Sequence, residues 1–227
     1  MQKSLGYSQT DLADKSESFL MFDEERNDSA HFKIWNDLRE GKNLAGEFRY
    51  KGVGGKEIWL SGTRSPVIGL DGKLIKVVLM LQDITESKLS RLDAEGKLGA
   101  IDRSQAVIEF DMQGKVLAAN NNFLKLMEYS AEEILGRHHR MFVDAAYAAT
   151  PQYQAFWESL GRGQFESGEY KRVAKGGREV WIQATYNPIY DPRGNLVKVV
   201  KFASDVTQSK LKNSEFEAKV EAINLGQ

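Results

Sequence analysis

The amino-acid sequence predicts an α+β fold made of two copies of one domain, each with antiparallel strands and short helices. Three observations lead to this prediction. The chain repeats itself at a constant offset of 122 residues. Within one copy, β-rich runs are separated by short turns that contain glycine. Apolar residues at helical spacing lie between and after these runs, so each copy contains both kinds of element.

The repeat determines the number of domains. Residues 46–89 and 168–211 share 18 identical residues in 44 ungapped pairs. Self-similarity over this length is the signature of a duplicated structural unit. We therefore expect a first domain at residues 1–84, a linker helix at 85–104, a second domain at 105–206 and a C-terminal helix at 207–227.

Five strands are expected in the second copy. Residues 106–111 and 115–119 are β-rich and flank the turn Met112-Gln-Gly114, which predicts an opening hairpin. Glycine-containing turns then separate three longer runs of strand character, whose alternating patterns predict an antiparallel sheet. These runs are residues 165–173, 179–190 and 196–204.

Helices are expected between the two groups of strands and after the last strand. Asn120 to Asn122 provide capping side chains, and Ser130 lies three residues before Glu133, the spacing of a capping box. Residues 152–160 follow a proline and carry apolar residues at helical spacing. An outgoing helix with one apolar stripe is expected after Asp205-Val-Thr207.

The first copy begins late in the repeat. Met1 corresponds to Phe123, so residues 106–122 have no counterpart in it. We expect its sheet to lack the first two strands, which leaves an exposed strand edge and an open pocket. On this basis the second domain is expected to be the intact sensor and the first the weaker ligand binder.

The composition excludes several classes of protein. The 227 residues include no cysteine, which excludes disulfide scaffolds, thiolate nucleophiles and Cys-ligated metals. The net charge of -1 argues against general binding to nucleic acid or anionic lipid. No apolar run reaches the roughly 20 residues of a membrane helix. Motifs for phosphate loops, nucleophile elbows and zinc helices are also absent from the sequence, so we do not expect an enzyme.

Short motifs recur in the order of these elements, and they resemble those of the PAS sensor domain. They are Asn122-Phe123, Tyr129-Ser130, Glu133-Ile-Leu-Gly136, Gly176-Gly177, Trp181, Pro188, Gly194 and Asp205-Val-Thr207. The segments 103–111, 136–143 and 180–188 are similar to the tandem PAS region of bacterial methyl-accepting chemotaxis receptors, of the biofilm-dispersion and aerotaxis-like type. The resemblance implies two five-stranded antiparallel sheets, the first N-terminally incomplete, each with short helices on one face that enclose a pocket.

His138 and His139 are the first candidate site residues. They are adjacent and lie where the short helices meet, a region that the resemblance places beside the pocket. A haem-iron ligand or a flavin contact would use such a histidine. The alternative is a structural pair, with one ring in solvent and the other hydrogen-bonded to backbone.

Three further residues are candidates for cofactor binding. Trp157 and Trp181 recur in the first copy as Trp35 and Trp59, and the resemblance implies a flavin contact in the region of Trp157. A packed core also requires aromatic residues, so both interpretations stay open. Asn187 lies on the sheet, where the family often holds its ligand. FAD is the first candidate cofactor, haem b the alternative, and a pocket without cofactor the third; no metal is expected except haem iron.

The candidate relay residues are the Asp-x-Thr pairs. Asp83 and Thr85 follow the last strand of the first copy, and Asp205 and Thr207 follow that of the second. An aspartate at a strand end beside a threonine at a helix start can cap the helix. We therefore expect strand position to be coupled to helix position at both junctions, with residues 207–227 as a signalling helix.

These features predict a sensory input module of a chemotaxis or signal-transduction receptor, which detects a ligand or redox state in a PAS pocket. The alternative is a cofactor-free structural and dimerising PAS pair that spaces an output domain. We expect a bacterial cytoplasmic homodimer without nucleic acid or membrane insertion. Its expected partners are a small-molecule ligand or cofactor and a C-terminal chemotaxis-type output domain that this chain does not contain.

Overall fold

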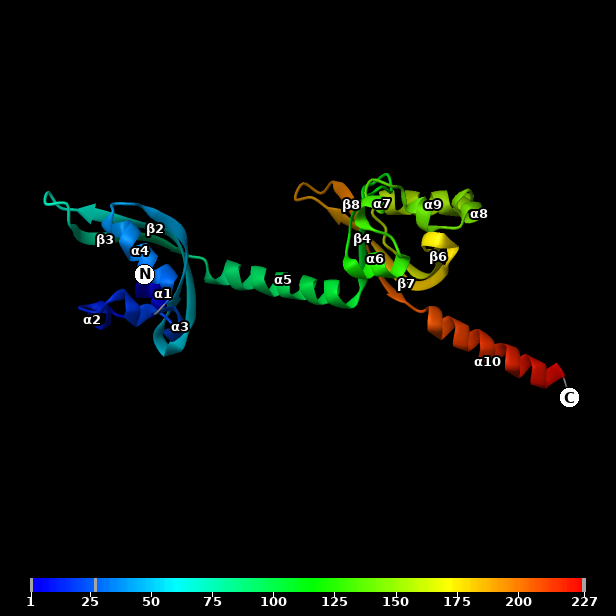
Figure 1. Cartoon of the computed structure of the whole chain (residues 1–227), viewed down its shortest axis with the longest axis horizontal. Helices are drawn as coiled ribbons and strands as arrows, with labels where there is room; N and C mark the ends of the chain where they lie inside the picture. Colours follow the sequence, from blue (N-terminus) through cyan, green and yellow to red (C-terminus); the bar gives the residue numbers. More distant parts are fainter. Residues whose placement is uncertain (1, 27, 226–227) are drawn as a thin grey trace. The chain divides into compact units, whose positions relative to one another are not determined.

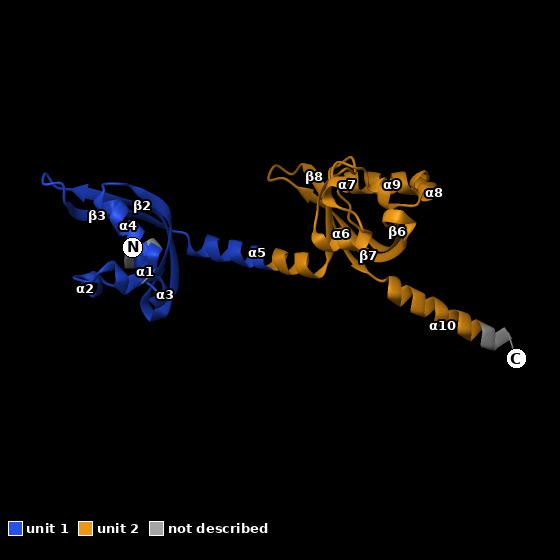
Figure 2. Ribbon diagram, viewed as in Figure 1, with its two compact units in different colours: residues 1–96 blue, residues 97–227 orange. Residues whose placement is uncertain are grey.

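The structure, a computed structural model, describes residues 2–26 and 28–225. It divides into two compact units, residues 1–96 and 97–227 (Figures 1 and 2). Each unit contains an antiparallel sheet with several helices, as the sequence predicts. The C-terminal residues 226 and 227, which the sequence assigns to the last helix, lie outside the described residues.

The first unit has a three-stranded sheet in the order β1-β2-β3. Helix α4 packs across all three strands. The elements are α1 (Gln2–Leu5), α2 (Gln9–Leu12), η1 (Glu17–Leu20), α3 (Asp23–Arg26), α4 (Ser29–Arg39), β1 (Leu44–Lys51), η2 (Val53–Gly55), β2 (Glu57–Ile68), β3 (Leu74–Asp83) and α5 (Thr85–Ser104). In agreement with the late start of the first copy, the described residues contain no strand beside β3 opposite β2.

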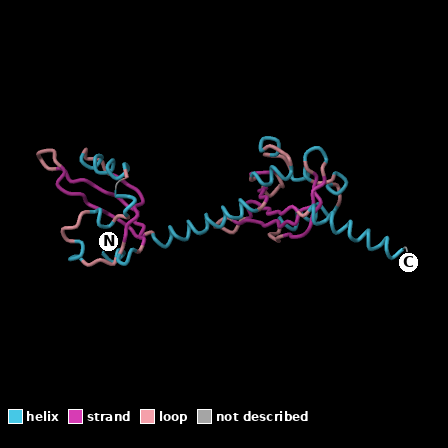
Figure 3. Tube along the Cα trace, turned by 60° about the horizontal axis from the view of Figure 1, so that its bottom comes forward, coloured by secondary structure: helices cyan, strands magenta, loops and turns pink. Residues whose placement is uncertain are grey.

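The second unit has a five-stranded sheet in the order β5-β4-β8-β7-β6, and every neighbouring pair is antiparallel. Figure 3 shows the strands of each sheet and the helix that follows it. The elements are β4 (Ala106–Phe110), β5 (Val116–Ala119), α6 (Asn121–Met127), α7 (Ala131–Ile134), η3 (His139–Phe142), α8 (Ala145–Ala148), α9 (Pro151–Gly161), β6 (Glu166–Val173), η4 (Lys175–Gly177), β7 (Glu179–Tyr190), β8 (Leu196–Asp205) and α10 (Thr207–Leu225).

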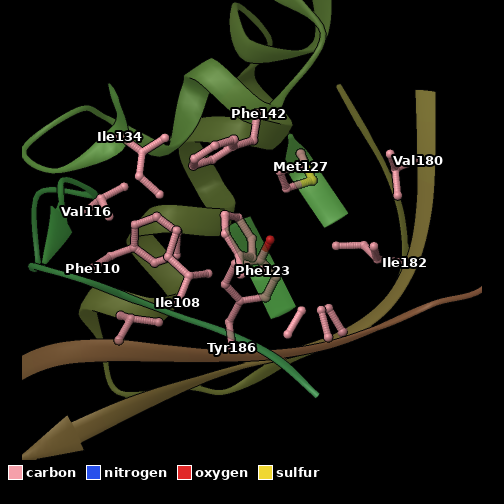
Figure 4. Close-up of a cluster of buried hydrophobic side chains, with 14 of the residues drawn as sticks. Ile108, Phe110, Val116, Phe123, Met127, Ile134, Phe142, Val180, Ile182 and Tyr186 are labelled. Carbon is pink, nitrogen blue, oxygen red and sulfur yellow. The ribbon is translucent and has the colours of Figure 1, made fainter. Parts of the chain in front are cut away.

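Alternation along β7 separates the two faces of this sheet. Val180, Ile182, Ala184 and Tyr186 are buried, while the intervening side chains are partly or fully exposed. The buried face packs against residues of α6, α7, η3 and α9 (Figure 4). This follows from the period of two in a strand, which places every second side chain on the same face.

Asn120 connects three elements of the second unit. Its Oδ1 accepts hydrogen bonds from the backbone N–H of Phe123 and of Val107, both at 2.9 Å. Its Nδ2 donates to the backbone oxygens of Asp102 and Gln105, both at 2.9 Å. One side chain therefore caps α6 and holds the end of α5 against the start of β4, which is the capping role that the sequence predicts.

Replacing Asn120 tests this role. We expect Asn120→Ala to lower the free energy of unfolding of the second unit by about 2–3 kcal/mol, since the cap is lost and two backbone N–H groups lose their acceptor. Urea denaturation of the full chain measures the change. Asn121→Ala, at the exposed first position of α6, is the matched control and should change stability by less than about 0.5 kcal/mol. Equal effects of the two substitutions would contradict the assignment.

Candidate functional site

The imidazole of His139 lies at the centre of the second unit. The side chain is 0% exposed and sits on η3 between the sheet and α9. Its Nδ1 lies 3.0 Å from the hydroxyl of Tyr153, and its Nε2 lies 3.1 Å from the hydroxyl of Tyr186. The ring also stacks on Tyr153 with an interplanar angle of 16°. Both ring nitrogens are therefore engaged by tyrosines from two different elements.

A buried arginine extends this chain of hydrogen bonds. Arg172 on β6 is 3% exposed, and its Nη2 donates to the hydroxyl oxygen of Tyr186 at 3.0 Å. The Tyr186 hydroxyl oxygen therefore lies between the guanidinium of Arg172 and Nε2 of His139. A neutral imidazole has one donor and one acceptor, so one ring nitrogen of His139 donates to a tyrosine hydroxyl and the other accepts from one.

Burial lowers the pKa of two basic groups in this core. Desolvation, with Arg172 and Lys201 nearby, holds the pKa of His139 well below its usual range. The pKa of Lys201 is likewise held far below its usual range by burial and by Arg172. Nζ of Lys201 lies 5.0 Å from the ring centre of Tyr186 and 5.6 Å from that of Phe123. Among the described residues, neither Arg172 nor Lys201 forms an ion pair.

The hydrogen-bonded chain reaches a surface groove at Tyr153. This groove has a volume of about 540 Å³, and its lining includes Gln113, His138, Arg140, Tyr153 and Trp157. The indole N–H of Trp157 is buried, and Trp157 lies close enough to the Tyr153 hydroxyl to oppose the rise in the pKa of Tyr153 that burial causes. A polar or aromatic molecule in the groove would contact Tyr153 and Trp157, at the end of the hydrogen-bonded chain that leads to His139.

The structure brings His138 and Trp157 beside His139. The ring centres of Trp157 and His139 are 5.4 Å apart, and those of Trp157 and His138 are 6.0 Å apart. Nδ1 of His138 accepts the backbone N–H of Arg140, which caps η3, and burial lowers the pKa of His138. Gly114 lies against both rings, because a Cβ there would meet His138 and Trp157 at 3.0 Å.

Trp181 and Asn187 do not join this group. They alternate along β7 with the buried Val180, Ile182 and Tyr186, so their side chains belong to the opposite face of the sheet. Asn187 donates to the hydroxyl of Thr185 and to the backbone oxygen of Val200. The five residues that the sequence suggests for cofactor binding therefore do not surround one space.

This arrangement does not fit a haem or a flavin held by those five residues. Both nitrogens of His139 are already hydrogen-bonded, and the space around its ring is filled by Phe110, Phe142 and Phe156. A metal ligand would have to give up a tyrosine partner and open the packed core. No group of three or more His, Asp or Glu side chains within residues 2–26 and 28–225 could hold a metal ion.

Trp181 instead belongs to the junction with α10. Its backbone N–H donates to Oγ1 of Thr207 at 3.0 Å, and its carbonyl accepts the N–H of Val206 at 2.9 Å. The Thr207 N–H donates to Oδ1 of Asp205 at 2.9 Å. Lys210 of α10 lies over the Trp181 ring. The predicted Asp-x-Thr pair thus fastens the first turn of α10 to β7.

The first unit has the same junction at the equivalent residues. The Trp59 N–H donates to Oγ1 of Thr85 at 3.0 Å, and the Thr85 N–H donates to Oδ1 of Asp83 at 3.0 Å. Hydrogen bonds from Thr85 lower the pKa of Asp83. Lys88 lies over the Trp59 ring, as Lys210 does over Trp181. The internal repeat therefore preserves the geometry by which each sheet is joined to its outgoing helix.

The first unit also has a buried polar triad at the positions of His139, Arg172 and Tyr186, with changed residues. Its members are Glu17, Tyr50 and Arg64, at the constant offset of 122. The Tyr50 hydroxyl donates to Glu17 at 2.7 Å and accepts from Arg64 at 3.0 Å. Arg64 also forms an ion pair with Glu17 at 2.9 Å. Tyrosine and arginine have exchanged positions between the units, and a carboxylate replaces the imidazole.

Sequence reasoning missed Tyr153, Arg172, Tyr186 and Lys201. The internal repeat could have indicated two of them, because the offset of 122 aligns Arg172 with Tyr50 and Tyr186 with Arg64. Lys201 occupies a buried position in the apolar run 199–203, where a cation is unusual. No feature of the sequence singles out Tyr153, since its position in α9 is equally compatible with a helix on the surface.

Family models match each half of the chain. A model described as a PAS domain matches residues 1–86, and one described as a PAS fold matches residues 116–203. A crystal structure of the PAS domain of a protein from Colwellia psychrerythraea is 22% identical, with a TM-score of 0.45 over 51% of this chain and 98% of that one. The dark-state structure of the blue-light photoreceptor Aureochrome1 LOV is 23% identical, with a TM-score of 0.42 over 52% of this chain and 86% of that one.

Two similar full-length proteins are longer than this chain. Biofilm dispersion protein BdlA of Pseudomonas aeruginosa is 39% identical over 203 residues, which are 89% of this chain and 49% of that protein. Oxygen sensor protein DosP of Escherichia coli is 21% identical over 187 residues, 80% of this chain and 23% of that protein. Within the described part of the chain, no helix is long and apolar enough to cross a membrane.

The depressed pKa of His139 predicts how stability depends on pH. His139 is neutral in the folded chain, whereas the unfolded chain takes up a proton as the pH falls through about 6.5. The unfolded state then binds more protons, so the free energy of unfolding should fall with decreasing pH, by at most about 1.4 kcal/mol per pH unit from this residue. His138 contributes in the same direction.

We expect His139→Gln to reduce this slope between pH 7 and pH 5, measured by urea denaturation of the full chain at each pH. Carboxylates with ordinary pKa values titrate mainly below this window. Ile134→Val on α7, which keeps every histidine, is the control and should keep the slope of the unsubstituted chain. An unchanged slope in His139→Gln would refute the assignment of a neutral buried imidazole.

Proposed function

Because this chain is a tandem of two PAS domains, we propose that it acts as the sensory input module of a signal-transduction protein. One relative is named a biofilm dispersion protein and another an oxygen sensor, and sensing an environmental stimulus is the class of function that suits both names. The proposed module is non-catalytic. It acts as a dimer and passes its signal from α10 to an output domain.

The observation that carries this proposal is that the polar core and the helix junction share two strands. On β7, Tyr186 belongs to the hydrogen-bonded chain, and Trp181 bonds to the start of α10. On β8, Lys201 faces the same core, and Asp205 caps the helix. A change in the core that shifts β7 against β8 therefore acts directly on the groups that position α10.

We assign the sensed molecule to the groove beside Tyr153 and Trp157. Both residues line the groove, and Tyr153 provides a hydroxyl that is hydrogen-bonded to His139. A small ligand or redox-active group that hydrogen-bonds to the Tyr153 hydroxyl would alter the bond between Tyr153 and His139. Binding there is communicated through His139 and Tyr186 to β7. The proposal does not require the five residues first suggested to converge on a flavin or haem.

A second candidate function is a cofactor-free structural pair that dimerises and spaces an output domain. The packing of the second unit favours it, because Phe110, Phe142 and Phe156 pack around the ring of His139. Visible absorbance and native mass spectrometry of the purified protein separate the two candidates. A bound group of defined mass supports the sensor, and a protein that binds nothing from cell extract supports the structural pair.

Coupling between the core and α10 is the direct test of the proposed relay. We expect Tyr186→Phe, which removes the hydroxyl shared by His139 and Arg172, to change amide hydrogen exchange at residues 208–211 by at least about fivefold. The matched control is Ile134→Val, a substitution on α7 of the same core that leaves the hydrogen-bonded chain intact. It is used under conditions that equalise global stability. If both variants change exchange at the start of α10 to the same extent, the relay through Tyr186 is wrong.

A further inference from the structure

Lys201 carries an amine that is buried in the middle of the second sheet. Its side chain is 1% exposed, and on β8 it lies between Ile108 of β4 and Tyr186 of β7, which are both 0% exposed. Its Nζ lies over the rings of Tyr186 and Phe123, and within the described part of the chain it forms no ion pair. Proteins seldom bury a lysine without a charged partner, so this position points to a chemical role.

The first unit differs from the second at this position and in the charge of its core. By the offset of 122, the counterpart of Lys201 is Leu79. In the first unit, the buried Arg64 forms an ion pair with Glu17 at 2.9 Å. In the second unit, Arg172 and Lys201 are both buried, and no Asp or Glu among the described residues forms an ion pair with either of them. The second core therefore lacks the anion that the first core has.

The surroundings of Lys201 favour nucleophilic chemistry at its amine. Burial and the guanidinium of Arg172 hold the pKa of Lys201 well below its usual range, which increases the fraction of neutral amine at any given pH. Desolvation among apolar groups and a neighbouring cation are the two means by which proteins activate a lysine as a nucleophile. Lys201 has both, so its amine is suited to attack an electrophilic carbon that can reach it.

The position of the amine limits which electrophile can react. A side chain that is 1% exposed and covered by aromatic rings excludes large reagents, and an apolar core excludes charged ones. An aldehyde would form an imine, which keeps a positive charge beside Arg172 when it is protonated. Carbon dioxide is small and uncharged, and its adduct with an amine is an anion, which the guanidinium attracts. The electrostatics of this core therefore favour carbon dioxide.

We propose that Lys201 binds carbon dioxide as a carbamate that Arg172 stabilises. The lone pair of Nζ attacks the carbon atom, an N–C bond forms, and one C–O π pair moves onto an oxygen. The nitrogen then loses one proton to water, which leaves a negatively charged carbamate on the side chain. Nε of Arg172 is buried without a hydrogen-bond partner and provides a donor for the new anion. The second core then pairs its arginine with an anion, as Glu17 does for Arg64.

Carbon-13 NMR of the full chain under labelled carbon dioxide tests the proposal. We expect a carbamate resonance, distinct from those of dissolved carbon dioxide and bicarbonate, which is lost in Lys201→Met. Lys201→Leu introduces the residue that the first unit has and should lose the resonance too. Lys198→Met replaces a partly exposed lysine of the same strand and is the matched control, which should keep the resonance. Cooperative urea unfolding shows that each variant is folded.

Amide hydrogen exchange then measures whether the new charge acts on α10. Lys201 pairs with Tyr186 of β7, and Asp205 of the same strand caps the helix. Exchange at residues 208–211 should change by at least about fivefold when carbon dioxide replaces nitrogen at constant pH, and this change should be absent from Lys201→Met. Carbamate formation is independent of the groove beside Tyr153. A carbamate without a change in exchange would support the site and contradict the relay through β7 and β8.

Either of two results would overturn the assignment of Lys201. The first is the absence of a carbamate resonance from the unsubstituted chain at saturating carbon dioxide. The second is a carbamate resonance that persists unchanged in both Lys201 variants, which would assign it to other amines of the chain.

Discussion

A tyrosine hydroxyl buried against the sheet is the interaction on which each unit depends. In the second unit, Tyr186 accepts from Arg172 and contacts His139, so three elements that are distant in sequence meet at one oxygen atom. A buried polar group without a partner is costly, and each of these groups can be satisfied only while the others hold their places. In the first unit, three different residues meet in the same way at the hydroxyl of a buried tyrosine, namely Glu17, Tyr50 and Arg64.

Tyrosine and arginine exchange positions between the units, which keeps the hydrogen bond between them but changes the charges around it. In the first unit, Glu17 neutralises the buried guanidinium of Arg64. In the second, the guanidinium of Arg172 and the amine of Lys201 face a neutral imidazole, and aromatic rings take the place of a carboxylate. An unneutralised buried cation is tolerated when rings and hydrogen bonds surround it, but it makes the core sensitive to any added charge. The second unit is therefore the electrostatically less balanced of the two.

The repeat in the sequence was sufficient to predict the strands and the capping residues, because turn chemistry and period-two patterns act locally. The site was harder to predict, since it depends on which face of a strand a side chain occupies. Trp181 and Tyr186 are five residues apart on β7 and so point to opposite faces, and only Tyr186 joins His139. Arg172 and Lys201 were missed because cations are ordinarily exposed, and only tertiary packing shows that these two are buried.

The alternation of side chains between the two faces of β7 also constrains how a signal can travel. Tyr186 faces the core, while Trp181 lies on the opposite face and holds Thr207 through its backbone. A side-chain contact cannot link them, so a change at Tyr186 reaches α10 only by moving the strand itself. The ladder permits this, because Tyr186 pairs with Lys201 and Ile182 pairs with Asp205 on the neighbouring strand. A shift of β7 against β8 therefore alters the backbone bonds of Trp181 and the cap at Asp205 together, which makes the strand pair the transmitting element.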